Sequence, residues 1–235
     1  MPLLDHLEEL RARLIRVIVA FLLLTLLCFA FHEPLLRLML RPAGEVKLIF
    51  TGPAESFLAS LRVVFACGFY LTLPILLHEG ISFVRPGLTL RERRWALPLL
   101  VASFLLFSLG VVFAYFLLLP VGLKFLLTFG PTEIQAMISI GHYIGFAAAL
   151  LLATGLSFQL PLVLLILASL GIVDGKKLKE ARKYALLGAF VAGGVLTPST
   201  DLFTQALLAG ALYLLYEVSI LGVWLRSPRE FSASP

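Results

Sequence analysis

Charged residues are scarce in this chain: Asp, Glu, Lys and Arg make up 14% of its 235 residues, against about 25% in an ordinary soluble domain. Apolar residues account for 60%. This balance excludes a soluble globular domain and predicts a chain whose solvent is the lipid bilayer. No polar segment is long enough for a separate domain, so we expect one membrane domain over residues 1–226 and a short cytoplasmic tail over 227–235.

Residues that carry catalysis or hold metals are also few. The two cysteines, Cys28 and Cys67, lie inside apolar runs without CxxC spacing, and the four histidines are scattered without metal-ligand spacing. The lysines at 176–177 lack the upstream glycine of a P-loop, and Ser157 lacks the second glycine of a nucleophile elbow. We therefore expect neither an enzyme nor a bound metal or cofactor.

The net charge of +5 could indicate nucleic acid. The basic residues lie beside apolar runs, however, where the positive-inside rule and anionic lipid explain them, so we expect membrane lipid and no nucleic acid as the partner. The first ten residues carry three acids, and no small-residue cleavage site follows Phe31. We expect the first apolar run to be a retained span and not a signal peptide.

Six apolar segments are long enough, or nearly long enough, to cross a bilayer, which needs about 20 helical residues. We predict an all-α, polytopic membrane protein with six transmembrane helices over residues 13–31, 61–83, 95–119, 139–171, 184–196 and 202–225. The prolines in or beside these spans predict a kinked, concave bundle. They are Pro74, Pro98, Pro120 and Pro161.

The stretch 134–173 carries no charge and could form either one tilted helix or a tight hairpin. A single span there places most of the Lys and Arg on one side of the membrane, whereas a hairpin would split them between both faces. The positive-inside rule therefore favours six spans with both termini cytoplasmic. The residues concerned are Arg11, Arg13, Arg16, Arg85, Arg91, Arg93, Arg94, Lys176, Lys177, Lys179, Arg182, Lys183, Arg226 and Arg229.

The last two helices are expected to be short. About thirteen apolar residues separate Tyr184 from the turn at 197–201, and such a helix covers about 20 Å of a core that is roughly 30 Å thick. We expect local thinning of the bilayer, or polar partners for this pair. A helix that runs one turn further at each end is the alternative.

Two acids are candidates for a binding site. Glu9 lies one turn before Arg13, a spacing that suits a solvated ion pair, and Glu92 lies in a basic loop. Both belong to the same side of the membrane in the predicted topology. If the first two spans pack together, Glu9 and Glu92 could converge and receive two guanidinium groups.

Three polar residues within or beside the later spans also need partners, because polar groups in lipid usually face the protein interior. Gln159 lies two residues before Pro161 and could satisfy carbonyls that the proline frees. Asp201 opens the last span, where either it or Thr200 suits a helix N-cap. Gln205 follows Asp201 by one helical turn.

These polar positions occur in an order that resembles the TatC subunit of the twin-arginine protein translocase. The motifs are His6-Leu7-Glu8-Glu9-Leu10-Arg11, Phe83 with Arg91-Glu92-Arg93-Arg94, Ser157-Phe158-Gln159-Leu160-Pro161, and Leu196-Thr197-Pro198 with Asp201 and Gln205. One position departs from the family pattern: Gln159 stands where the family often has Glu, so a proton-carrying role is not expected there.

The resemblance implies a receptor, in the plasma membrane of a prokaryote, that binds the twin-arginine signal peptides of folded proteins at its cytoplasmic face. It implies self-association and assembly with TatA-type and TatB-type single-span proteins for export driven by the proton-motive force. By position, Glu9 and Glu92 match the acids that contact the signal's arginines, and Arg11 and Phe83 match neighbouring functional positions. Asp201 and Gln205 match polar positions implicated in partner binding and transport.

A small-molecule or ion secondary transporter is the alternative function. Such a transporter should contain repeated halves and broken helices near the membrane midplane, and no convincing repeat of three plus three spans is visible. An intramembrane enzyme would need a nucleophile with its base, or a metal site. The translocase subunit is therefore favoured.

Overall fold

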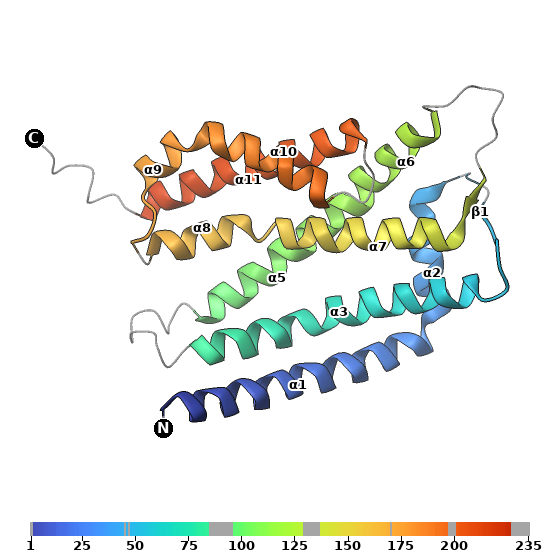
Figure 1. Ribbon diagram of the computed structural model, residues 1–235, viewed down its shortest axis with the longest axis horizontal. Helices are drawn as coiled ribbons and strands as arrows, with labels where there is room; N and C mark the ends of the chain where they lie inside the picture. The colour runs from blue at the N-terminus through green and yellow to red at the C-terminus, as the bar shows by residue number, and fades with distance from the viewer. Residues whose placement is uncertain are drawn as a thin grey trace, which may run out of the picture. The chain divides into compact units, whose positions relative to one another are not determined.

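The structure is a computed structural model, and it describes residues 2–44, 46, 48–84, 96–128, 137–169, 171–196 and 201–226. These residues are almost all helical (Figure 1). The elements are α1 (Pro2–Ala30), α2 (His32–Leu40), η1 (Arg41–Ala43), β1 (Leu48–Ile49), α3 (Glu55–Val84), α5 (Ala96–Phe113), the π-helical turn η3 (Ala114–Leu118), α6 (Leu119–Thr128), β2 (Ile138–Ser139), α7 (Ile140–Ser157), α8 (Leu160–Ser169), α9 (Gly175–Glu180), α10 (Arg182–Leu196) and α11 (Leu202–Arg226).

In the part of the chain that the structure describes, each predicted span falls mainly on helix. Within the described residues, five helical stretches are long and apolar enough to cross a membrane: His6–Ala30, Glu55–Phe83, Leu97–Thr128, Ile140–Ser169 and Leu202–Trp224. The remaining predicted span falls on α10, which has 15 residues and is therefore about 22 Å long. The prediction of an all-α membrane protein is confirmed, and so is the shortness of α10.

The prediction that both of the last two helices are short is wrong for α11, which has 25 residues. Its apolar run continues to Trp224, and two polar side chains in its second half find partners. Glu217 pairs with Arg182 at 2.7 Å, and the Ser219 hydroxyl donates to the Leu215 carbonyl at 2.6 Å. The helix therefore continues to Arg226.

The stretch from α7 to α8 is one span interrupted at Phe158 and Gln159, and not a hairpin, since α8 continues in the direction of α7 (Figure 1). Pro161 has no N–H to donate, so the regular hydrogen-bond pattern cannot pass through it. The Gln159 N–H bonds back three residues to Leu156, and the Gln159 carbonyl accepts from Leu162 and Val163. The helix is thus interrupted just before Pro161, where a kink was predicted.

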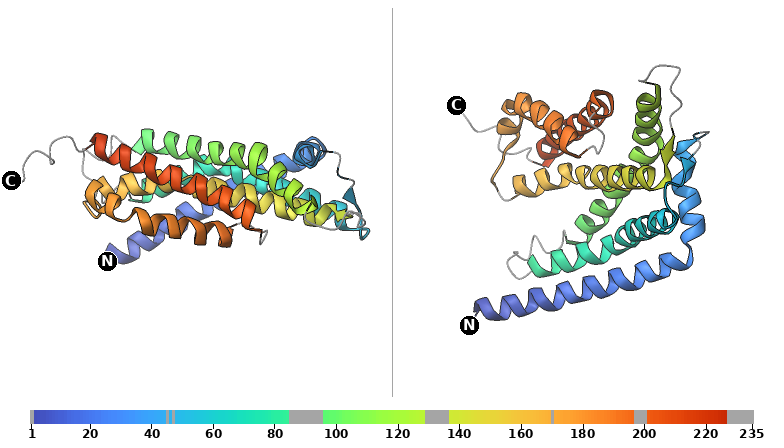
Figure 2. Two further views of the ribbon diagram at one scale, coloured as in Figure 1. Left: turned by 90° about the horizontal axis from the view of Figure 1, so that it is seen from above. Right: turned by 45° about the vertical axis from the view of Figure 1, so that its right-hand side comes forward.

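The chain divides into two compact units: residues 1–105 with 136–148, and residues 106–135 with 149–235. In unit 1, α1 and α3 run antiparallel and side by side (Figures 1 and 2). They approach closely where Thr25 faces Gly68. A Cβ added to this glycine would lie only 2.2 Å from the Thr25 hydroxyl oxygen, so there is no room for a larger residue. The outer face of α1 is apolar and exposed, as expected for a helix that contacts lipid.

The start of α7 is tied to α3 at the other end of unit 1. Glu55 accepts hydrogen bonds from the Gly141 N–H at 2.9 Å and from the Thr51 hydroxyl at 2.8 Å. Arg62 donates to the Gly141 carbonyl at 2.7 Å, and Gly145 leaves room for its guanidinium. The glycine spacing at 141–145 therefore serves internal packing. The strands β1 and β2 form a two-residue parallel pair beside it.

In unit 2, α8, α9 and α10 all pack on α11. A small apolar core joins α9 to α11 through Leu178, Tyr216, Ile220 and Val223, and the Tyr216 hydroxyl donates to the Leu178 carbonyl at 2.6 Å. These contacts join α9 to α11, while α10 packs directly on α11 to form a hairpin.

Candidate functional site

The antiparallel pairing of α1 and α3 brings the first turns of α1 to the last turns of α3 (Figure 1). Four ionised side chains meet at this end of unit 1: Glu9, Arg13 and Arg16 from α1, and Glu79 from α3. We call them the acid–arginine cluster. Residues 9, 13 and 16 are spaced by four and three positions, so they share one face of the helix.

Arg13 links the two acids of this cluster. Its Nε donates to Glu9 Oε1 at 3.0 Å, and its Nη1 donates to Glu79 Oε2 at 2.8 Å. The other oxygen of Glu79, Oε1, accepts from Arg16 Nη1 at 2.6 Å. Two carboxylates thus balance two guanidinium groups, and each Glu79 oxygen receives a charge-assisted hydrogen bond.

Exposure rises across the cluster from α3 to the surface. The Glu79 side chain is 10% exposed and that of Arg13 17%, whereas Glu9 is 34% and Arg16 56% exposed. Burial of an unpaired carboxylate would be costly, and the hydrogen bonds from the two arginines offset this cost for Glu79. Glu9 is the more accessible of the two acids.

Phe83 joins the same region. The His6 ring stacks on the Phe83 ring with 4.2 Å between centroids and 16° between planes. His6 Nδ1 also lies 3.8 Å from Glu9 Oε2. Phe83 follows Glu79 by one helical turn, so α3 contributes a buried acid and an aromatic ring to the same face.

Of the residues predicted for this site, Glu9 and Phe83 come together through His6. Arg11 is exposed and makes none of the ion pairs found among the described residues. It lies two positions from both Glu9 and Arg13, which places it on the opposite side of α1 from the acid–arginine cluster. Glu92 lies outside the described residues, so its predicted convergence with Glu9 stays a prediction.

The predicted ion pair between Glu9 and Arg13 is present, but it is only partly solvated. Arg13 turns inward because Glu79 offers it a second carboxylate. The sequence interpretation also missed Glu79 itself. The available signal was an acid at the end of the apolar run 61–83, where a charged side chain in a span needs a partner.

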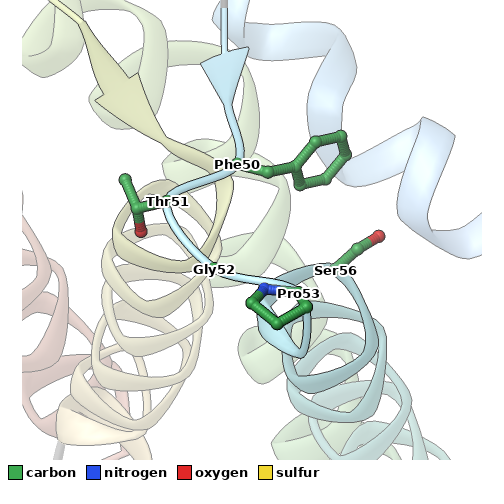
Figure 3. Close-up of a pocket in the computed structure, with 5 residues that line it drawn as sticks. All are labelled: Phe50, Thr51, Gly52, Pro53 and Ser56. Atoms are coloured by element: carbon green, nitrogen blue, oxygen red, sulfur yellow. The ribbon is translucent and has the colours of Figure 1, made fainter.

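A pocket of about 490 Å³ lies in the loop that leads into α3, and Phe50, Thr51, Gly52, Pro53 and Ser56 line it (Figure 3). These residues carry no ionisable side chain. Ser56 and Glu79 lie near opposite ends of α3, which is about 45 Å long at 1.5 Å per residue. The pocket is thus separate from the acid–arginine cluster.

The predicted polar positions of unit 2 hold helix ends and helix pairs. Asp201 Oδ1 accepts from the Thr204 N–H at 2.6 Å, which confirms Asp201 as the N-cap of α11. Gln205 Nε2 donates to the Phe190 carbonyl of α10 at 2.9 Å. Gln159 lies at the break between α7 and α8 described above. Among the described residues, no group of His, Cys, Asp and Glu is suited to a metal ion.

Known proteins resemble this chain over nearly its whole length. The family model described as Sec-independent protein translocase protein (TatC) matches residues 5–210. The chain belongs to the TatC family. A TatC of Synechocystis is 42% identical over 92% of this chain and 85% of its own length, and a TatC of Aquifex aeolicus is 40% identical over 94% and 93%.

Solved TatC structures agree with this fold. A crystal structure described as the twin arginine translocase receptor TatC in DDM has a TM-score of 0.81, with 38% identity over 93% of this chain and 99% of that one. A second TatC crystal structure has a TM-score of 0.76 at 40% identity. This TatC family member is therefore a multi-pass membrane component of a protein translocase and not an enzyme, and the small-molecule transporter is set aside.

Proposed function

We propose that this chain is the receptor subunit of a twin-arginine translocase, and that Glu9 and Glu92 bind the two arginines of a signal peptide. The observation that carries the proposal is the position of Glu9: its carboxylate is 34% exposed beside the stacked rings of His6 and Phe83. A carboxylate next to aromatic faces suits a guanidinium group, which accepts both ion pairing and stacking.

The distribution of basic residues supports a cytoplasmic location for this end of the chain. Arg11, Arg13 and Arg16 precede or open the first span, and four more arginines lie at 85–94. The positive-inside rule assigns such segments to the cytoplasm, so both termini face inward. A signal peptide on a newly folded protein would meet this face first.

Partner assembly is proposed for the α10–α11 hairpin. The outer face of α10 carries Leu187, Val191 and Val195, which are exposed and spaced by one helical turn. This apolar ridge on a helix of only 15 residues suits TatA-type and TatB-type single-span helices. Export by this complex is driven by the proton-motive force.

The test of the receptor role is capture of an Arg-Arg signal peptide by Glu9→Ala and Glu92→Ala variants. We expect each change to weaken capture by about 10- to 150-fold, because a lost hydrogen bond to a charged group costs about 1.5–3 kcal/mol. Site-specific cross-linking of the peptide to the purified protein in detergent measures this.

The matched control is Glu33→Ala, since Glu33 pairs with Arg37 on α2 and its side chain is 69% exposed. It removes an acid of the same chain without touching the proposed site. Cross-linking that is unchanged in both the Glu9 and Glu92 variants would contradict the proposal.

A further inference from the structure

Glu79 is a buried acid that is not among the residues proposed to contact the peptide. Its side chain is 10% exposed at the end of α3, and both of its oxygens are bound by arginines of α1. A binding role by direct contact does not suit an acid so enclosed. Glu79 is linked to Glu9 through Arg13, which binds both acids.

Arg13 donates in two directions from one planar group. Nη1 binds Glu79, while Nε and Nη2 both bind Oε1 of Glu9. The guanidinium plane is rigid, so fixing Nη1 on Glu79 also fixes where Nε and Nη2 point. Glu79 is the more buried of the two acids and is held a second time by Arg16, so it anchors this chain of ion pairs.

The anchored Arg13 leaves the two oxygens of Glu9 in different states. Oε1 is occupied by two donors of Arg13. Oε2 has His6 Nδ1 as its neighbour at 3.8 Å, beyond hydrogen-bond distance. A guanidinium that approaches Glu9 therefore finds Oε2 available, next to the stacked rings of His6 and Phe83.

We infer that Glu79 is a positioning residue of the signal-peptide site: acting through Arg13, it fixes the Glu9 carboxylate so that Oε2 receives an arginine of the peptide. This inference rests on the proposed role of Glu9. Without the anchor, Arg13 can turn with the flexible Glu9 side chain, and the peptide must then order both groups when it binds.

Glu79 also contributes a negative charge, and the two effects can be separated. Glu79→Gln leaves Arg13 and Arg16 facing one acid, so a weaker Arg-Arg peptide complex could arise from repulsion alone. Adding Arg16→Gln restores the balance of one acid to one arginine. It does not restore the charge-assisted hydrogen bond from Arg13 to the Glu79 carboxylate.

The experiment measures binding of an Arg-Arg signal peptide to the purified full chain in detergent, with thermal unfolding as the check on folding. We expect Glu79→Gln to weaken binding by about tenfold, and the Glu79→Gln/Arg16→Gln double variant to stay about equally weak. Recovery of affinity in this double variant would overturn the positioning role, since charge alone would then explain the loss.

A second double variant tests whether Glu79 acts through Glu9. We expect Glu9→Gln/Glu79→Gln to bind no more weakly than Glu9→Gln, because the anchor has nothing left to position. Fully additive losses would overturn the inference. If Glu79→Gln binds the peptide as tightly as wild type while Glu9→Gln binds it more weakly, the positioning role of Glu79 is overturned and the receptor role stands. If Glu9→Gln itself binds the peptide as tightly as wild type, the receptor role is contradicted.

Arg13→Lys keeps the inference testable if Glu79→Gln does not fold. Lysine retains the charge but cannot hold two carboxylates with a planar fork. We expect it to weaken the peptide complex about as much as Glu79→Gln, and normal binding by Arg13→Lys would overturn the inference. Glu33→Gln on the exposed pair with Arg37 is the control for loss of an ion pair.

Discussion

A single side chain, Arg13, joins the two acids of the acid–arginine cluster. A lysine at this position could pair with either acid, whereas the guanidinium of Arg13 reaches both Glu9 and Glu79. Residue-scale contacts of this kind depend on how closely α1 approaches α3. That approach is set by Gly68, which faces Thr25.

Gly68→Ala is therefore expected to separate the two helices. The new methyl group would lie 2.2 Å from the Thr25 hydroxyl oxygen and 3.0 Å from its Cα, so α1 has to shift. Overpacking of this kind typically costs about 1–3 kcal/mol, which thermal unfolding in detergent measures.

Gly80→Ala is the control within the same helix, because a Cβ there meets nothing within 4 Å. We expect it to be neutral or slightly stabilising, since alanine has the higher helix propensity. Equal unfolding temperatures for Gly68→Ala and wild type would show that this contact does not hold the helices together.

At the scale of the element, the sequence predicts most of what the structure contains. Apolar runs of about 20 residues have only one hydrogen-bonded conformation available in lipid, so the helices follow from composition alone. The N-cap at Asp201 and the break before Pro161 also follow, because both arise from local hydrogen bonds.

The ion pairs of Glu79 could not be predicted in the same way. Glu79 is 66 residues from Arg13 in the sequence, and their contact depends on the register of α1 against α3. Helical periodicity gives the faces of each helix but not this register. The prediction that α11 is short was wrong because the short apolar length that limits α10 does not apply to α11, whose apolar run continues to Trp224.

Gln205 is the element-scale test of the α10–α11 hairpin. Gln205→Leu removes the hydrogen bond to the Phe190 carbonyl, and Gly193 and Gly194 pack directly against this side chain. We expect the hairpin to loosen and co-purification of a single-span partner to fall, while peptide binding at unit 1 stays normal.

Ser169→Ala is the matched control, because the Ser169 hydroxyl is exposed and donates only within its own helix, to the Ile166 carbonyl. It should leave partner co-purification unchanged. Normal co-purification with Gln205→Leu would contradict the role proposed for the hairpin.

At the scale of the whole molecule, the apolar helices determine that the chain lies in the membrane, and the basic segments determine its orientation there. The apolar helices confine the chain to the membrane, and the basic segments at 11–16, 85–94 and 176–183 give the side that we propose is cytoplasmic. Within unit 1, Arg13 and Arg16 lie beside the proposed acidic site, so we expect it to select a cationic peptide through geometry and not through net charge.

The most direct test of the receptor role compares two signal peptides that differ only in the paired residues, Arg-Arg against Lys-Lys, on the purified chain in detergent. Both carry the same charge, so only recognition of guanidinium geometry separates them. We predict that the Arg-Arg peptide binds at least about tenfold more tightly, and that Glu9→Gln reduces this difference. Equal affinity for the two peptides would contradict a site built for twin arginines.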